Sequence, residues 1–318
     1  MGQGEKKILI SVDGSEHSFE AVRYVAQMLP AGRAKVTLFH VISRLPDSLL
    51  DVKKTSGIGY KFVGSQAWEQ HQEKKIGDFM ERASRILKTA GYSTDSISVV
   101  VRQRKGGIAR DIGREAQKGY DALVLGRRGV SRFKDFIIGS VANKLIDHLQ
   151  NVPLWVVGGH PDTKKILVAM DGSEGAMAAA EYVGNVLGDA CPELLLLNVV
   201  RGLLALELSY EELSFEERDL IKLTKEELEK AKVEMESVFE DATKKLEQKG
   251  VDIRRIKTKF VSEAISRAGS IIEEADKGGY DTIVVGRRGL SKVEAFFMGR
   301  VSSKVMQLAK EKALWIVG

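Results

Sequence analysis

The chain has 318 residues, 43% of them hydrophobic and 29% charged, which suits two domains with apolar cores and excludes a disordered protein. No apolar stretch approaches the roughly 20 residues that span a bilayer, and one cysteine excludes an internal disulfide, so we expect a cytoplasmic protein without membrane contacts. Residues 1–160 carry 25 Lys and Arg against 16 Asp and Glu, but no recognition motif accompanies this charge of +9, so we expect no nucleic-acid partner.

The first half of the chain alternates short apolar runs with amphipathic segments. Such runs are typical of strands buried on both faces of a parallel sheet that helices cover. Between them, apolar residues recur at helical spacing, and Ser15 and Gly91 suit the beginning of the first helix and the end of the second. The predicted strands are 8–12, 36–42, 97–101, 122–125 and 154–157, and the predicted helices include 19–29, 76–87, 108–116 and 141–149. This alternation predicts an α/β domain.

Two longer segments have a different character. Residues 43–65 contain three glycines and are predicted to form a loop. Residues 210–249 are highly charged and are predicted to form one or two long helices, since Ser209 with Glu212 and Thr224 with Glu227 have the spacing of a capping box.

The chain is an internal duplication. The 24 residues from Lys6 match those from Lys164 without gaps at 12 positions, and the 27 residues from Gly119 match those from Gly279 at 13 positions. A turn-rich stretch at 158–163 separates the copies. We therefore expect two domains, 1–158 and 164–318, each with a five-stranded parallel sheet and helices on both faces.

A glycine signature follows the fourth predicted strand: Gly126 and Gly129, then nine residues, then Gly139 and Ser140 before a helix. Glycine lets the backbone approach a phosphate, and a helix N-terminus attracts an anion. Asp13, directly after the first strand, can accept hydrogen bonds from ribose hydroxyls or an adenine amino group. Singly, the glycines could be turn residues and Asp13 a helix cap, but in combination they indicate a mononucleotide site.

The Val-Asp-Gly-Ser segment at Val12 and the Gly-x2-Gly-x9-Gly-Ser signature resemble the universal stress protein family, in both halves of the chain. The resemblance implies two tandem Rossmann-like domains of the adenine nucleotide alpha hydrolase-like type, with strand order 3-2-1-4-5. It also implies ATP between the first and fourth strands, with Mg²⁺ as a candidate accompanying ion. The implied adenine and ribose contacts are Val12, Asp13 and Val41. The implied phosphate contacts are Gly126, Gly129, Gly139, Ser140, Val141 and Ala142.

The resemblance further implies dimerisation through the last strands, here 153–157 and 314–317. Because the copies are fused, we expect an intrachain pseudo-dimer with Trp155 and Trp315 near its pseudo-twofold axis. Whether two whole chains also form a homodimer is left open by the sequence.

The second copy departs from the signature, because Arg300 stands where the first copy has Ser140. An arginine at a helix N-terminus opposes the helix dipole and fills the phosphate volume. Since Asp171, Gly286 and Gly289 are kept, we expect a degenerate site, the alternative being an altered site in which Arg300 carries the phosphate charge.

The sequence contains no Walker-type, serine-hydrolase, zinc-protease or kinase motif. Whether the protein is an enzyme is therefore left open, and any hydrolysis of ATP is expected to be slow. The resemblance implies a role in the stress response, and we expect a cytoplasmic, ATP-binding protein in which nucleotide occupancy modulates contacts with a protein partner. A nucleotide-independent interaction scaffold and a slow ATP hydrolase are the alternatives.

Overall fold

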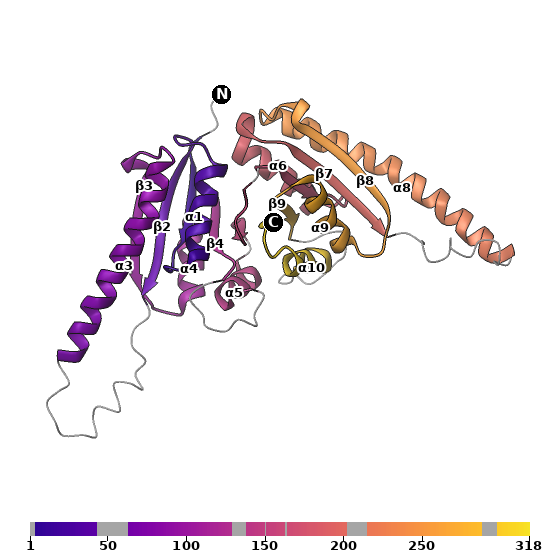
Figure 1. Cartoon of the computed structure of the whole chain (residues 1–318). Coiled ribbons are helices and arrows are strands. Elements are labelled where there is room, and N and C mark those ends of the chain that lie inside the picture. Colours follow the sequence, from indigo (N-terminus) through magenta and orange to yellow (C-terminus); the bar gives the residue numbers. More distant parts are fainter. Residues whose placement is uncertain are drawn as a thin grey trace, which may run out of the picture. The chain divides into compact units, whose positions relative to one another are not determined.

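The computed structural model describes residues 4–42, 63–128, 138–149, 151–162, 164–201, 215–287 and 298–318. The chain divides into two compact units, Glu5–Leu149 and Gln150–Gly318 (Figure 1). The fold class is confirmed, since strands alternate with helices throughout and each copy of the duplication contributes five strands. None of the described helices is long and apolar enough to cross a membrane.

The first unit is built on a parallel sheet with the strand order β3-β2-β1-β4. Its elements are β1 (Lys6–Ser11), α1 (Glu16–Met28), β2 (Ala34–Ile42), α3 (Val63–Thr89), β3 (Ile97–Gln103), α4 (Ile108–Ala116), β4 (Ala122–Gly126) and α5 (Ser140–His148). Residues Ile8, Leu9 and Ile10 are all fully buried, because helices cover both faces of β1. Helix α1 packs against α3, and α4 packs against α5. Right-handed crossovers put each pair on its own face of the sheet.

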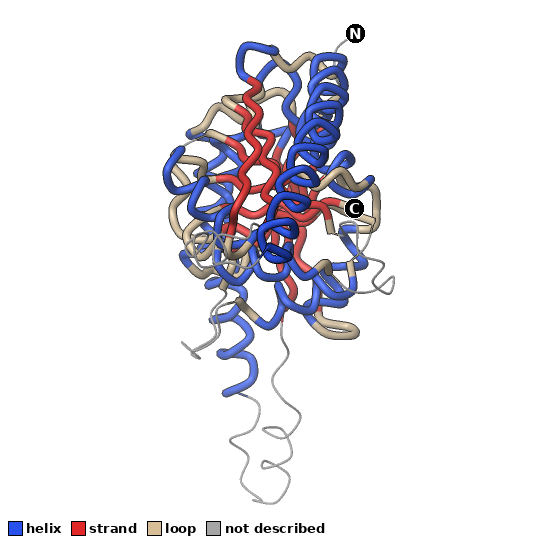
Figure 2. The backbone as a smooth tube through the Cα atoms, turned by 90° about the vertical axis from the view of Figure 1, so that its right-hand side faces the viewer, coloured by secondary structure: helices blue, strands red, loops and turns tan. Residues whose placement is uncertain are grey.

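The second unit repeats this arrangement and adds one strand from the first copy. Its strand order is β5-β10-β9-β6-β7-β8, parallel except for the pair of β5 with β10. Its elements are β5 (Leu154–Val157), β6 (Ile166–Ala169), α6 (Glu174–Leu187), β7 (Leu194–Arg201), α8 (Phe215–Gln248), β8 (Ile256–Ala264), α9 (Arg267–Gly278), β9 (Thr282–Gly286), α10 (Arg300–Leu308) and β10 (Ala313–Val317). The long helix α8 packs against α6 and β8, and in Figure 2 it lies across the strands on the side nearest the viewer.

The last strands of the two copies pair with each other inside the second unit. Strand β5 runs antiparallel to β10, with Trp155 directly opposite Trp315. The two indole rings stack with centroids 3.9 Å apart and planes 3° from parallel, and Trp155 Nε1 donates to the Tyr182 hydroxyl at 3.1 Å. The expected pairing of the last strands is confirmed. Because β5 lies in the second unit, the boundary between the compact units falls before β5, whereas the boundary between the sequence repeats falls after it. The domains 1–158 and 164–318 therefore stay a prediction.

The two longer segments are partly described. Residues 43–62 of the expected loop lie outside the described residues, and 63–65 already belong to α3. The expected long helix of the second copy is confirmed as the single helix α8. Thr224 lies inside α8, so the prediction that it begins a helix is wrong, because an N-cap needs a non-helical backbone. Ser209 and Glu212 lie outside the described residues.

Candidate functional site

The first unit brings the segment after β1 and the start of α5 to one edge of its sheet. Strands β1 and β4 are parallel neighbours, with Ser11 beside Leu125. Arg127, directly after β4, accepts a hydrogen bond at 2.8 Å from the N–H of Gly139, the N-cap of α5. The strand order reverses between β1 and β4, and ligands of open α/β sheets bind outside the carboxyl ends of strands at such a reversal.

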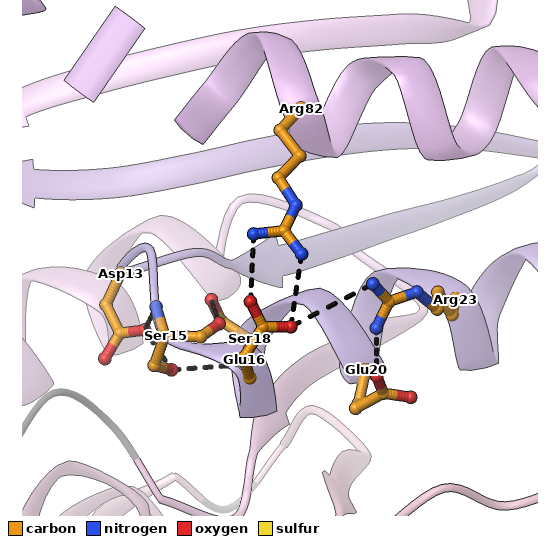
Figure 3. A network of polar contacts seen from close by, with 7 residues as sticks. All are labelled: Asp13, Ser15, Glu16, Ser18, Glu20, Arg23 and Arg82. Atoms are coloured by element: carbon orange, nitrogen blue, oxygen red, sulfur yellow. Dashed lines mark hydrogen bonds and ion pairs between the residues drawn. The ribbon is translucent and has the colours of Figure 1, made fainter. Parts of the chain in front are cut away.

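The N-terminal turn of α1 orients Asp13. Asp13 Oδ1 accepts hydrogen bonds from the N–H of Ser15 at 3.0 Å and from its hydroxyl at 2.6 Å. Ser15 also caps α1, since its Oγ accepts from the N–H of Ser18 at 3.2 Å (Figure 3). A carboxylate has about four lone-pair positions, so accepting from Ser15 does not exhaust it.

An ion-pair network joins α1 to α3 beside this turn. Glu16 pairs with Arg82 at 2.9 Å, and the Arg82 guanidinium lies 4.0 Å from the centroid of the Phe19 ring. Arg23 bridges Glu16 and Glu20 from within α1 (Figure 3). Glu16 and Arg82 are largely exposed, so their ion pair contributes at most about 1 kcal/mol and mainly fixes the position of α3 over α1. Glu20, in contrast, is buried.

His40 holds the backbone immediately before Asp13. Its Nδ1 lies 2.7 Å from the carbonyl oxygen of Val12, so Nδ1 carries the ring proton and Nε2 is an acceptor in the neutral ring. Burial lowers the pKa of His40, although the bond to Val12 and the charge of Asp13 oppose this shift. The Phe79 ring of α3 meets the imidazole edge-on, with centroids 5.0 Å apart.

Val12 and Val41 are buried at the carboxyl ends of neighbouring strands. The N–H of Val12 donates to the carbonyl of Phe39 at 2.9 Å, which extends the β1–β2 pairing beyond the end of β1. Both valines therefore lie at the same sheet edge as Asp13.

Gly126 is required by packing. A Cβ atom at this position would lie 2.5 Å from the carbonyl carbon and oxygen of His17 in α1. The close approach of β4 to α1 thus explains the glycine whether or not a phosphate lies nearby, and its phosphate contact stays a prediction.

The N-terminus of α5 supplies hydrogen-bond donors. The first hydrogen bond of the helix runs from the N–H of Asn143 to the carbonyl of Gly139. The N–H groups of Ser140, Val141 and Ala142 precede it in the first turn, where a helix offers no backbone acceptor to its N–H groups. Ser140 is exposed, Val141 half-buried and Ala142 buried. Gly129, the remaining residue of the expected site, lies outside the described residues.

The second unit repeats much of this edge. Asp171 Oδ1 accepts from the N–H and hydroxyl of Ser173, and Gly299, the N-cap of α10, donates to the carbonyl of Arg287. Arg300 is exposed at the first position of α10. Gly289 lies outside the described residues.

Sequence reasoning missed His40 and Phe79 as parts of this edge. Asn198 occupies the position of His40 in the second unit and donates from Nδ2 to the carbonyl of Met170 at 2.8 Å. A comparison of the two copies could have indicated the role, since both residues can donate to a carbonyl.

Comparison with known proteins agrees with this architecture. A sequence model described as Universal stress protein family matches residues 5–158 and, separately, residues 162–316. The chain is 27% identical over 183 residues to a universal stress protein of Mycolicibacterium smegmatis, a match that spans 56% of this chain and 58% of that relative. It is 29% identical over 153 residues to the universal stress protein YxiE of Bacillus subtilis, which covers 48% of this chain and 97% of the relative.

Solved structures share the fold over the whole chain. A universal stress protein from Archaeoglobus fulgidus covers 98% of this chain and 97% of its own, with a TM-score of 0.61 and 18% identity. A functionally unknown protein from Pseudomonas aeruginosa PAO1 covers 99% and 93%, with a TM-score of 0.50 and 14% identity. Since the family model matches nearly the whole length in two consecutive copies, the chain belongs to the universal stress protein family.

Proposed function

We propose that the first unit binds ATP, and that nucleotide occupancy modulates how this cytoplasmic stress-response protein contacts a protein partner. The observation that carries the proposal is the convergence of Asp13 and the N-terminus of α5 at the strand-order reversal between β1 and β4. A carboxylate and a helix N-terminus at one edge suit the ribose and the phosphates of a mononucleotide.

The residues at this edge fit ATP group by group. The first-turn N–H groups of α5 and the Ser140 hydroxyl would hold phosphate oxygens, and Asp13 would accept from the ribose. Val12 and Val41 would border the adenine. The described part of the chain holds no group of three or more His, Cys, Asp or Glu side chains that could bind a metal. A Mg²⁺ ion would therefore take most of its ligands from phosphate and water.

The second unit would bind ATP much more weakly. Its helix N-terminus carries Arg300 in place of Ser140, which removes a hydroxyl donor and opposes the helix dipole by about 0.3–1 kcal/mol. Crowding at this position would also displace phosphates from the first-turn N–H groups. Two lost charge-assisted hydrogen bonds, each worth roughly 1.5–3 kcal/mol, weaken binding by at least about a hundredfold. One ATP per chain is the expected stoichiometry.

Calorimetric titration of nucleotide-stripped, full-length protein tests the proposal. We expect a stoichiometry near one, at least about a hundredfold weaker binding for Ser140→Arg, and unchanged affinity of the first site in the matched variant Arg300→Ser. Unchanged binding by Ser140→Arg would overturn the site, and two sites of similar affinity would overturn the proposal for the second unit.

The nucleotide released when the freshly purified protein is denatured separates the function classes. ATP supports a nucleotide-binding regulator. ADP favours a slow hydrolase, and the absence of nucleotide favours a scaffold.

A further inference from the structure

Strand β3 forms the outer edge of the first unit's sheet and is unusually exposed. Within the described residues it pairs with β2 alone. Val99 and Val101 are 49% and 37% exposed, and their spacing of two residues puts both side chains on the same face of the strand. An edge strand presents a row of backbone N–H and C=O groups that another chain can pair with.

A cluster of cations surrounds the carboxyl end of this strand. We define the basic cluster as Arg102, Arg104, Lys105, Arg110 and Arg114, all of which are exposed. The acid within it, Asp111, accepts hydrogen bonds from the backbone N–H groups of Lys105 at 2.8 Å and of Gly106 at 3.1 Å. Asp111 therefore fixes the turn between β3 and α4, and the cluster keeps an excess of positive charge.

The second unit lacks the basic cluster at the same positions. The register of β3 on β2 and of β8 on β7 matches Ile97 with Ile256, and the N-caps Gly107 and Ser266 keep the same offset, so the two sequences align without a net gap. Strand β8 differs from β3 in a register shift between Val199 and Arg201 of its partner β7. The five matching residues of the second copy are Val261, Glu263, Ala264, Gly269 and Glu273. At these five positions the first copy carries five positive charges, whereas the second copy carries two negative charges.

We propose that the β3 edge and the basic cluster form a docking surface for an acidic, extended segment of a partner protein, which joins the sheet as an added strand. Alternate side chains of such a segment would cover Val99 and Val101, and its carboxylates would meet the guanidinium groups of the cluster. A nucleic acid fits less well, because residues 97–116 contain no aromatic side chain on which bases could stack.

Fluorescence anisotropy of a labelled peptide with the full-length protein, without nucleotide, tests this surface independently of the ATP site. The probe is a peptide of about ten residues that alternates Glu and Val, the length of a long strand. The variant Arg102→Val, Arg104→Glu, Lys105→Ala installs the residues that stand at the matching sequence positions of the second copy. The matched control Lys74→Glu, Lys75→Glu makes the same change in net charge on exposed residues of α3.

We expect the triple variant to bind the peptide at least about tenfold more weakly than the unmodified protein and the control. Val99→Lys should also weaken binding although it adds positive charge, because it removes the apolar contact. A probe with proline in place of valine should fail to bind, since proline cannot donate to an edge strand.

Three results with the peptide probes would overturn the inference. These are no binding of the Glu-Val peptide, equal binding of the proline peptide, or tighter binding of Val99→Lys. Preferential, cluster-dependent binding of an oligothymidylate probe would assign the surface to nucleic acid instead.

Discussion

Two glycines of the first unit differ in what surrounds them, and this difference predicts opposite effects of the same substitution. Gly126→Ala should destabilise the protein by about 1–3 kcal/mol, because the added Cβ would lie 2.5 Å from the backbone of His17. Gly77→Ala should stabilise it by about 0.5–1 kcal/mol, because Gly77 is exposed within α3 and no atom lies within 4 Å of its added Cβ.

Urea denaturation of both variants measures these changes. If Gly126→Ala were as stable as the unmodified chain, α1 would have to lie farther from β4 than the structure shows. Tight ATP binding by a destabilised Gly126→Ala protein would separate the packing role of this glycine from its predicted phosphate contact.

The half-buried imidazole of His40 predicts a pH dependence of stability. Burial lowers its pKa in the folded protein, against the hydrogen bond to Val12 and the charge of Asp13. As the pH falls through about 6.5, the unfolded chain takes up the proton first, so the free energy of unfolding falls. The loss continues until the folded-state pKa is reached, with a slope of at most about 1.4 kcal/mol per pH unit.

The variant His40→Asn isolates this effect, because Asn198 makes the equivalent bond to a carbonyl in the second unit. The stability of the unmodified protein minus that of His40→Asn should decrease as the pH is lowered below about 6.5. The other histidines are present in both proteins and cancel in the difference. A difference that stayed flat or rose on acidification would show that His40 is not held neutral.

At the scale of elements, the N-cap of α1 links helix stability to the candidate site. Ser15→Ala and Ser173→Ala each remove an equivalent cap and should each cost about 1 kcal/mol of stability. Only Ser15→Ala should weaken ATP binding, because Ser15 orients Asp13 in the unit proposed to bind ATP. Thermal unfolding and calorimetric titration of both variants measure the two effects, and equal ATP affinity in both would show that Asp13 needs no orientation by Ser15.

Most strands were predictable because short runs that are apolar on both faces are typical of a parallel sheet covered by helices. The same pattern predicted the strand at 97–101, but the expectation that it is buried on both faces is wrong, because β3 lies at the edge of the sheet and has no buried residue. The predicted run at 154–157 coincides with β5, and that at 36–42 differs from β2 by two residues. The capping box at Thr224 misled, because this segment is rich in the helix formers Leu, Lys and Glu, and α8 continues through Thr224. The repeat identified Asp13 and the start of α5, but the contact of His40 with Val12 depends on strand register, which no local pattern specifies.

At the scale of the whole molecule, the duplication of the sequence is related to the position of β5, the last strand of the first copy, in the second unit. The strand that ends the first copy completes the sheet of the second unit, where Trp155 and Trp315 are fully buried against each other. An aromatic pair of this kind adds about 0.5–1.5 kcal/mol beyond the burial of its area. Fusion of the copies therefore makes intramolecular a contact that separate copies would have to form by association.

This arrangement predicts that residues 1–160, expressed alone, self-associate. Without β10, the edge of β5 and the face of Trp155 lose their partners, and an unpaired apolar edge recruits another chain. A second copy of the fragment offers an identical strand, which can pair antiparallel about a twofold axis with Trp155 stacked on its counterpart. Sedimentation velocity should show a dimer of the fragment, and Trp155→Lys in the same fragment should give a monomer, because a charge at the centre of the pair cannot be buried unpaired. A fragment that stayed monomeric at concentrations of tens of micromolar, with the helical content of a folded unit by circular dichroism, would show that β5 and β10 pair only because the linker holds them together.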